Sequence, residues 1–435
     1  MRPQADLIVH NIGQLLTMEA ESDGRGDREA DPIAGLGLVL DAAVAIAGER
    51  VLWVGRERDL AAAVDDSRAE RLDVGGRVVM PGLIDCHTHT VFAGSRAQEF
   101  ARRVGGASYE ELLAAGGGIH ATVRATREAA LDLLVATGMQ RLETFLGFGV
   151  TTVEIKSGYG LAVDQELKML RAVAELERRH PIDVVPTLLG AHVMPKHHPG
   201  GRAGFVAEVI EEMIPQAAEE HLARFCDVFC EQGAFAIDET RRILQAGLDH
   251  GLRPKIHGEQ LSRAGSVALA VDLGAVSIDH LEHADAADAE RLAASDTVAV
   301  LLPGATYFLG KNSFADGRRL ADAGCRVAVS TDFNPGSCHS ENLPLMLNMA
   351  CLYNRLFPRE VLLGATRWAA DALALGDECG SLAPGRLADV LVLDMRDYRN
   401  FVYHFGVEHS YRVLKRGRLV WSRPESRCSA GGPAD

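Results

Sequence analysis

The amino-acid sequence predicts an α/β fold: a (β/α)8 barrel of the TIM type with a small β-sandwich domain built from both ends of the chain. In the middle of the chain, apolar strand-like runs alternate with segments of helical period, which predicts a parallel sheet covered by helices on both faces. Eight such units in roughly 290 residues match the barrel in number and size. At both ends, short alternating runs are joined by Gly and Asp turns, a pattern typical of a small sandwich.

The two ends of the chain are expected to supply the small domain. β-rich runs lie at residues 5–19 and 38–56, with a polar loop between them. Similar short runs return after residues 385–389 and continue to Trp421. We therefore expect residues 1–80 and 376–435 to form the small domain and residues 81–375 to form the barrel.

The barrel elements are expected where apolar runs and helical periods are bounded by turn residues. The strands are predicted at residues 83–86, 150–155, 182–189, 226–230, 253–256, 276–279, 297–301 and 326–330. The helices are predicted near 124–147, 162–179, 204–223, 238–250, 260–273, 285–294 and 314–323, with another at 341–353 after the last strand. A doubly wound open sheet is the structural alternative, but the chain lacks a Gly-x-Gly-x-x-Gly turn after a first strand, which that fold uses to bind dinucleotides.

Composition excludes several classes of partner. The formal net charge of −15 argues against nucleic acid and against an anionic membrane surface, because both require basic patches. The eight cysteines include no Cys-x-x-Cys pair, and this usage suits a reducing compartment. The N-terminus lacks the apolar core of a signal peptide. These features predict a cytoplasmic protein that acts on a small molecule.

Histidine and aspartate residues at the strand ends predict a metal site. His87 and His89 close the first barrel strand, and alternate residues of an extended strand point to the same side. His257 ends the fifth strand and Asp332 ends the eighth. Taken singly, each is more readily explained as a hydrogen-bonded histidine or a capping aspartate. Together they would lie at the carboxyl-terminal rim, where barrel enzymes place their active sites, and three nitrogens with one carboxylate suit catalytic zinc or iron.

The motifs around these positions resemble the amidohydrolase superfamily and, more finely, its imidazolonepropionase family. The resemblance rests on Pro81-Gly82-Leu83-Ile84-Asp85-Cys86-His87-Thr88-His89, Val91-Phe92-Ala93-Gly94-Ser95-Arg96, Glu154-Ile155-Lys156-Ser157-Gly158-Tyr159-Gly160, Leu189-Gly190-Ala191-His192, Lys255-Ile256-His257-Gly258-Glu259-Gln260 and Ser330-Thr331-Asp332-Phe333-Asn334-Pro335-Gly336-Ser337. It implies hydrolysis of the cyclic amide of 4-imidazolone-5-propanoate to N-formimidoyl-L-glutamate. It also implies one zinc or iron ion per subunit, and it allows a homodimer.

The resemblance assigns roles to individual residues. Asp332 is expected to ligate the metal and to carry the proton, and His280 to lie beside the metal and polarise the ring carbonyl. A hydrogen-bonding support role is the alternative for His280. The propionate is expected to meet Arg96 as a two-pronged partner. The remaining substrate contacts implied are Tyr109, Tyr159, His192, Gln260, Asn334, Gly336 and Ser337.

Gln260 is the position where the chain departs from some relatives. A glutamate three residues after the strand-five histidine can shuttle protons, whereas Gln260 cannot titrate and Glu259 is expected to point elsewhere. We expect Gln260 to bind substrate. Two alternatives stay open: a metal-dependent deaminase of a purine, pyrimidine or related ring, and a catalytically silent barrel that serves as a binding module.

Overall fold

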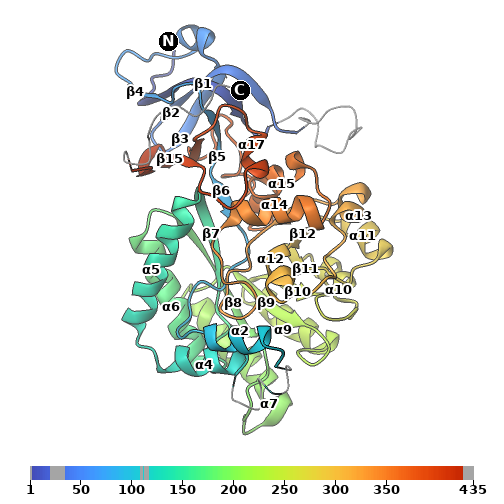
Figure 1. Ribbon diagram of the computed structural model, residues 1–435. Coiled ribbons are helices and arrows are strands. Elements are labelled where there is room, and N and C mark those ends of the chain that lie inside the picture. Colours follow the sequence, from blue (N-terminus) through green and yellow to red (C-terminus); the bar gives the residue numbers. More distant parts are fainter. Residues whose placement is uncertain (1, 20–34, 108–110, 112–116, 425–435) are drawn as a thin grey trace.

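The computed structural model describes residues 2–19, 35–107, 111 and 117–424, and it has two parts (Figure 1). The larger part is a barrel of eight parallel strands, each hydrogen-bonded to its neighbours in chain order. The strands are β6 (Leu83–Asp85), β7 (Val150–Lys156), β8 (Asp183–Ala191), β9 (Phe225–Cys230), β10 (Arg253–Gly258), β11 (Ser277–His280), β12 (Val298–Leu301) and β13 (Val327–Val329). The eight predicted strands are confirmed, with bounds that differ by at most two residues.

The barrel closes just beyond its first and last strands. Thr88, three residues after Asp85 at the end of β6, forms a parallel bridge with Phe333. The amide of His89 donates to the carbonyl of Phe333 at 2.9 Å, and the amide of Asp332 donates to the carbonyl of His87 at 3.1 Å. The seam between β6 and β13 is therefore closed by the segments that carry the predicted metal ligands.

Most of the predicted helices are present. Those that agree closely with prediction are α6 (Val163–Arg179), α9 (Ile237–Asp249), α11 (Ala286–Ala293), α13 (Gly317–Ala323) and α14 (Leu343–Tyr353). Helices α2 (Ala97–Val104), α12 (Pro303–Phe308), α15 (Pro358–Gly364) and α16 (Arg367–Asp371) were not expected from the sequence.

Three predicted helices differ in detail. The segment 124–147 contains two helices, α4 (Ile119–Glu128) and α5 (Leu131–Gly147), because Ala129 and Ala130 are extended. The segment 204–223 is divided into α7 (Gly201–Glu208), a π-helical turn η2 (Val209–Met213) and α8 (Ile214–Glu219). Pro215 lacks an N–H for the ordinary helical bond, so a wider turn before it is expected. Finally, α10 (Ser266–Asp272) begins six residues later than predicted.

The small part of the structure is a mixed sheet from both chain ends, as predicted. Its strands are β1 (Leu7–Leu16), β2 (Leu38–Ala47), β3 (Arg50–Arg56), β4 (Glu70–Asp73), β5 (Val78–Pro81), β14 (Val390–Leu393), β15 (Ser410–Lys415) and β16 (Arg418–Ser422), with the short helical turns η1 (Glu57–Asp59), α1 (Leu60–Ala63) and α17 (Asn400–Tyr403). β5 pairs with β1 on one side and antiparallel to β14 on the other, which joins the two ends. Side chains of β2 and β14 share one buried apolar cluster, so the sheet folds over on itself like a sandwich.

A buried group of charges connects the small sheet to the barrel. The ammonium of Lys415 in β15 donates to Asp389 at 2.6 Å and to Asp183 at 2.8 Å. Asp183 begins β8, so this contact lies at the end of the barrel opposite the strand carboxyl ends. Lys415 is 3% exposed and Asp389 is 5% exposed. Lys415 and Asp389 therefore contribute to stability as a pair, because burying either charge without its partner would be costly.

Candidate active site

The predicted site residues converge on one cavity of about 800 Å³ at the carboxyl-terminal end of the barrel. Those that line it are His89, Arg96, Tyr159, His192, His257, Gln260, His280, Asp332, Asn334, Gly336 and Ser337. His87 is fully buried next to it. Tyr109 lies outside the described residues, so its predicted contact is not placed. The carboxyl ends of the barrel strands thus bring together side chains that are up to 250 positions apart in the sequence.

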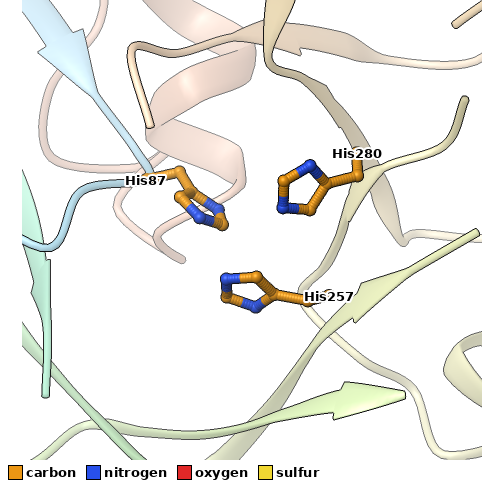
Figure 2. Close-up of side chains that lie close together, drawn as sticks. All are labelled: His87, His257 and His280. Carbon is orange, nitrogen blue, oxygen red and sulfur yellow. The ribbon is translucent and has the colours of Figure 1, made fainter. Parts of the chain in front are cut away.

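Four of these side chains surround one point. The Nε2 atoms of His87 and His89 each lie 3.6 Å from Oδ1 of Asp332. The ring centres of His87 and His257 are 4.4 Å apart. His280 joins them from β11, and its ring centre lies 5.3 Å from that of His257. Figure 2 shows His87, His257 and His280 arranged around a common space.

The donor set fits a metal ion. The Nε2 atoms of His87 and His257 are buried and have no hydrogen-bond partner among the described residues, although buried polar atoms are normally paired. Ligand atoms at about 2.1 Å from a tetrahedral zinc ion lie about 3.4 Å from one another, close to the 3.6 Å separations in this cage. His87, His89 and Asp332 form one candidate ligand group, and His87, His257 and His280 form an overlapping one.

A buried network of charges orients two of the histidines from below. Asp279 accepts a hydrogen bond from Nδ1 of His87 at 2.6 Å, and Asp227 lies 3.0 Å from Nδ1 of His257. The ammonium of Lys156 donates to Asp227 at 2.8 Å and lies 3.6 Å from Asp279. Carboxylates in this position fix the tautomer and orientation of ligating imidazoles, so the opposite nitrogen of each ring faces the cage.

The same network explains Lys156. Its ammonium also donates to Glu154 at 3.0 Å, and the carboxylates of Glu154, Asp227 and Asp279 raise its pKa against the effect of burial. Lys156 is therefore held as a cation. A paired ammonium of this kind is not a carbamylated bridging ligand.

Burial controls the protonation of the cage. It raises the pKa of Asp332 to about 7, because a carboxylate loses its hydration there. It lowers the pKa of His87, His89 and His280 well below the usual histidine value, with neighbouring cations and imidazoles adding to the effect. These three imidazoles are thus neutral near pH 7, which is the form that binds metals.

The backbone is strained at the turns that present the site. His280 has φ +89°, Leu281 +70°, Glu259 +56° and Asp332 +52°. Positive φ is uncommon for residues other than glycine and costs of order 1–3 kcal/mol per position. The strain lies at the ends of β10, β11 and β13, where side chains must leave the strand direction to face the cavity.

His280 stands beside a second buried carboxyl group. Its Nδ1 is buried and has no hydrogen-bond partner among the described residues. Oε1 of Glu282 lies 3.9 Å from it and accepts a hydrogen bond from the hydroxyl of Thr306 at 3.0 Å. Burial raises the pKa of Glu282 to about 8. His280 therefore keeps free hydrogen-bonding capacity next to the cage.

Arg96 is seated at the wall of the cavity by two neighbours. Its Nε donates to Glu99 at 3.0 Å, and its Nη2 contacts the other oxygen of the same carboxylate. The amide of Gly118 donates to Glu99 at 2.7 Å. Gly336 packs against the far edge of the guanidinium, since a Cβ at that position would lie 2.2 Å from Nη1 of Arg96. Nη1 forms no hydrogen bond with a described residue, and Arg96 lines the cavity.

Tyr159 and His192 form an aromatic wall above the cage. The rings of His89 and His192 stack with centres 5.2 Å apart, and that of Tyr159 lies 5.6 Å from His192. Nδ1 of His192 lies 3.0 Å from the carbonyl of Gly158, so a proton on Nδ1 would leave Nε2 as an acceptor. Burial lowers the pKa of His192 to about 4.

The turn after Asp332 is fixed by Asn334. Its amide nitrogen donates to the carbonyl of Asp332 and to the hydroxyl of Ser337, both at 2.7 Å. Its amide oxygen accepts from the backbone N–H groups of Gly336 and Ser337, both at 2.8 Å. The side chain of Asn334 is thereby committed to the turn, and the Ser337 hydroxyl lies 3.3 Å from Asp332.

Glu259 points away from the cavity, as the sequence interpretation expected. Its carboxylate accepts from the backbone N–H groups of Ala264 and Ser266 at 3.0 and 2.7 Å. It therefore holds the start of α10, while Gln260 lines the cavity.

Sequence reasoning missed the residues that support the site. Asp227 is a charged residue within an apolar strand run, and that contrast was the available signal. Lys156 ends a strand run that also contains polar residues, so it was less conspicuous. Glu99 and Glu231 gave no such signal, since neither lies inside a predicted strand.

The comparisons with known proteins agree on one family. The model of the amidohydrolase family matches residues 78–420. An imidazolonepropionase of Symbiobacterium thermophilum is 44% identical over 422 residues, which cover 97% of this chain and 98% of the relative. An imidazolonepropionase of Myxococcus xanthus is 44% identical over 424 residues and covers 98% and 99%.

Solved structures share the fold at low sequence identity. A 5-methylcytosine deaminase from Klebsiella pneumoniae has a TM-score of 0.72 at 17% identity and covers 96% of this chain and 98% of its own. An adenosine deaminase from Xanthomonas campestris with bound zinc has a TM-score of 0.69 at 17% identity and covers 96% and 93%. Among the described residues, none of the helices has the length and apolar character needed to cross a membrane.

Proposed function

The chain belongs to the amidohydrolase family and, within it, to the imidazolonepropionases; from this premise we propose that it opens the ring of 4-imidazolone-5-propanoate. Water adds to the ring carbonyl carbon, the C–N bond of the cyclic amide breaks, and the product is N-formimidoyl-L-glutamate. This is a step of histidine degradation. The observation that carries the proposal is the presence of candidate metal ligands and of Arg96, a cation suited to a carboxylate, in one cavity.

The cage would hold one zinc or iron ion per subunit through His87, His89, His257 and Asp332. When bound, the ion supplies Lewis acidity and lowers the pKa of water to about 7. The unpartnered imidazole nitrogens and the 3.6 Å separations support this ligand set. His280 contributes to an overlapping group, and we assign it to the substrate instead.

Asp332 is the proposed proton carrier. It takes a proton from the attacking water and returns it to the departing ring nitrogen, as a general base and then a general acid. Asp332 belongs to the cage and also lines the cavity, which supports this role, and so does its contact with the Ser337 hydroxyl at 3.3 Å. His280 donates a hydrogen bond to the carbonyl oxygen, where negative charge develops; its free Nδ1 supports that assignment.

Arg96 is the proposed anchor for the propionate. Glu99 occupies the Nε–Nη2 edge of its guanidinium, so the carboxylate of the substrate meets the Nη1–Nη2 edge as a two-pronged pair. Tyr159, His192 and Gln260 contact the ring. The Asn334–Ser337 turn lines the other side through Asn334, Gly336 and Ser337, and we retain Tyr109 as a further contact.

A deaminase is the alternative that the sequence left open, and it is not favoured. Relatives with 44% identity over almost the whole chain are imidazolonepropionases, whereas the deaminases resemble it at 17% identity, a level that shows fold alone. Gln260 cannot shuttle a proton as a glutamate would, and deamination leaves Arg96 without a role.

The proposal extends to setting and assembly. A cytoplasmic location is supported by seven free cysteines among the described residues, since disulfides are rare in that compartment. A homodimer remains a prediction. We also keep the division into a barrel of residues 81–375 and a small domain of residues 1–80 and 376–435.

The test is incubation of metal-loaded protein with imidazolone propionate while the ring absorbance is followed. Loss of absorbance with formation of N-formimidoyl-glutamate is expected, and release of ammonia would instead support deamination. Imidazolone without the propionate is the control for Arg96: equal turnover would remove the anchor from the proposal. Complete loss of turnover in Gln260→Ala together with retention of most turnover in metal-loaded Asp332→Asn would show that the roles assigned to these two residues are wrong.

A further inference from the structure

Glu231 is a buried carboxylate at the cavity rim that the proposed chemistry does not use. It follows the last residue of β9 and is 3% exposed. The three residues after it, Gln232, Gly233 and Ala234, line the cavity. A buried carboxylate in this position needs a physical account, because removing its charge from water is costly unless donors replace the solvent.

The donors come from the loop after β10. Oε1 of Glu231 accepts from the backbone N–H of Gln260 at 2.6 Å and from that of Leu261 at 2.9 Å. Oε2 accepts from the hydroxyl of Ser262 at 2.7 Å and from the backbone N–H of Gln232 at 3.3 Å. Both oxygens are thus satisfied, and three of the four donors belong to one short segment.

Beyond Glu231 and Glu259, the segment is held by Arg263, whose guanidinium lies 2.7 Å from Asp285 and 3.2 Å from Asp288. Residues 260–265 are neither helix nor strand, and Leu261 is 49% exposed. The backbone enters it through Glu259 at φ +56°. Glu259 holds the far end through Ala264 and Ser266. The near end, which carries Gln260 into the cavity, is held by Glu231.

We propose that Glu231 is a positioning residue for Gln260: its carboxylate fixes the backbone of residues 260–262, and so sets where the Gln260 side chain meets the substrate ring. This inference rests on the proposed function, in which Gln260 contacts the imidazolone. The hydrogen bonds of Glu231 also join the loops after the neighbouring strands β9 and β10, which keeps these two loops in one arrangement. Misplacement of a substrate contact by about 1 Å can reduce the rate about 100-fold.

The first experiment reads the loop without any need for activity. Hydrogen–deuterium exchange is compared between the wild type, Glu231→Ala and the control Glu290→Ala, which removes an exposed carboxylate from α11. We expect faster exchange in a peptide spanning residues 260–262 of Glu231→Ala only, with the β10 strand unchanged. Unchanged exchange in residues 260–262 would overturn the proposal.

The second experiment measures kinetics with bound metal quantified in each variant. Glu231→Ala is expected to lower kcat/KM by about 10- to 100-fold at unchanged metal content. Glu231→Gln keeps an acceptor for both amides and can donate to Ser262, so it is expected to stay within about threefold of the wild type. In a Gln260→Ala background, Glu231→Ala should add less than about threefold, because residues that act through each other are not additive. An equal loss in both backgrounds would mean a general structural role and would overturn the proposal.

A milder variant protects the test against misfolding. Ser262→Ala removes one donor and is expected to lower kcat/KM by about fivefold, again only when Gln260 is present. An effect that persists in the Gln260→Ala background would contradict the inference. If the wild type fails to open the ring while residues 260–262 still depend on Glu231, the proposed function is wrong and the loop contact stands. If the wild type turns over and Glu231→Ala matches it, the positioning role is wrong.

Discussion

Substitution of Gly336 by alanine should displace Arg96 without disturbing the fold. A Cβ at residue 336 would lie 2.2 Å from Nη1 of Arg96 and 3.1 Å from its Cζ. Ordinary non-bonded contacts begin near about 3.5 Å, so the guanidinium must retreat by about 1.3 Å. Gly336 does not have a positive φ, and an alanine there meets no backbone strain of that kind. The end of a flexible side chain takes up the displacement.

The size of the effect follows from the contact that is lost. A hydrogen bond to a charged group contributes about 1.5–3 kcal/mol, which corresponds to about 10- to 150-fold in an equilibrium or rate constant. Because the propionate is anchored before and during ring opening, its loss should raise KM and leave kcat nearly unchanged. Stability should stay within about 1 kcal/mol of the wild type, since Gly→Ala also restricts the unfolded chain.

Steady-state kinetics and urea unfolding of Gly336→Ala test this prediction. Gly147→Ala is the matched control, because the nearest atom to its added Cβ would be 3.8 Å away. In an Arg96→Ala background the Gly336 substitution should have no further effect on KM. An unchanged KM in the single variant, or an equal rise for imidazolone without the propionate, would refute the reasoning.

Two further predictions concern the metal site and the connection between the domains. Metal affinity of the apoprotein should fall about tenfold per pH unit below pH 7 and level off above it, because burial raises the pKa of Asp332 to about 7 and the carboxylate is the ligand form. Chelator competition across this pH range measures the affinity. Asp332→Asn should lose the pH dependence, and a flat profile in the wild type would contradict the prediction. Lys415→Met should destabilise the protein by about 3 kcal/mol, because Asp389 would keep its burial and lose its cation. Urea unfolding measures this loss; kcat/KM should be unchanged, and a stability equal to the wild type would count against the interpretation.

The strands and the rim were predictable because they depend on local pattern. Residues 298–301, for example, are all apolar, which is typical of strands covered on both faces. Once the barrel is inferred, the polar residues at strand ends must share a rim. His87 and Asp332 could therefore be assigned to one site although they belong to the first and last strands.

The supporting residues could not be predicted, because their contacts do not depend on local pattern. Asp227 contacts His257 only because β9 and β10 pair in one register, Asp227 beside Lys255 and Val228 beside Ile256. Glu231 meets Gln260 through loops whose course follows no sequence period. The break between α4 and α5 falls at Ala129 and Ala130, although alanine is a good helix former, and it depends on how the two helices pack. Register and packing decide these contacts, and local pattern carries no record of them.

The seam of the barrel gives the metal cage a second consequence. Asp85 and Ser330, whose side chains also contact across the seam, are separated by 245 residues, and the ligands His87 and Asp332 lie just beyond them on either side. An ion held by both would cross-link the first and last barrel strands, β6 and β13, as a disulfide that encloses a very long loop does. The metal site would then also stabilise the closure of the barrel, and removal of the ion by a chelator would be expected to weaken the structure at the seam between β6 and β13.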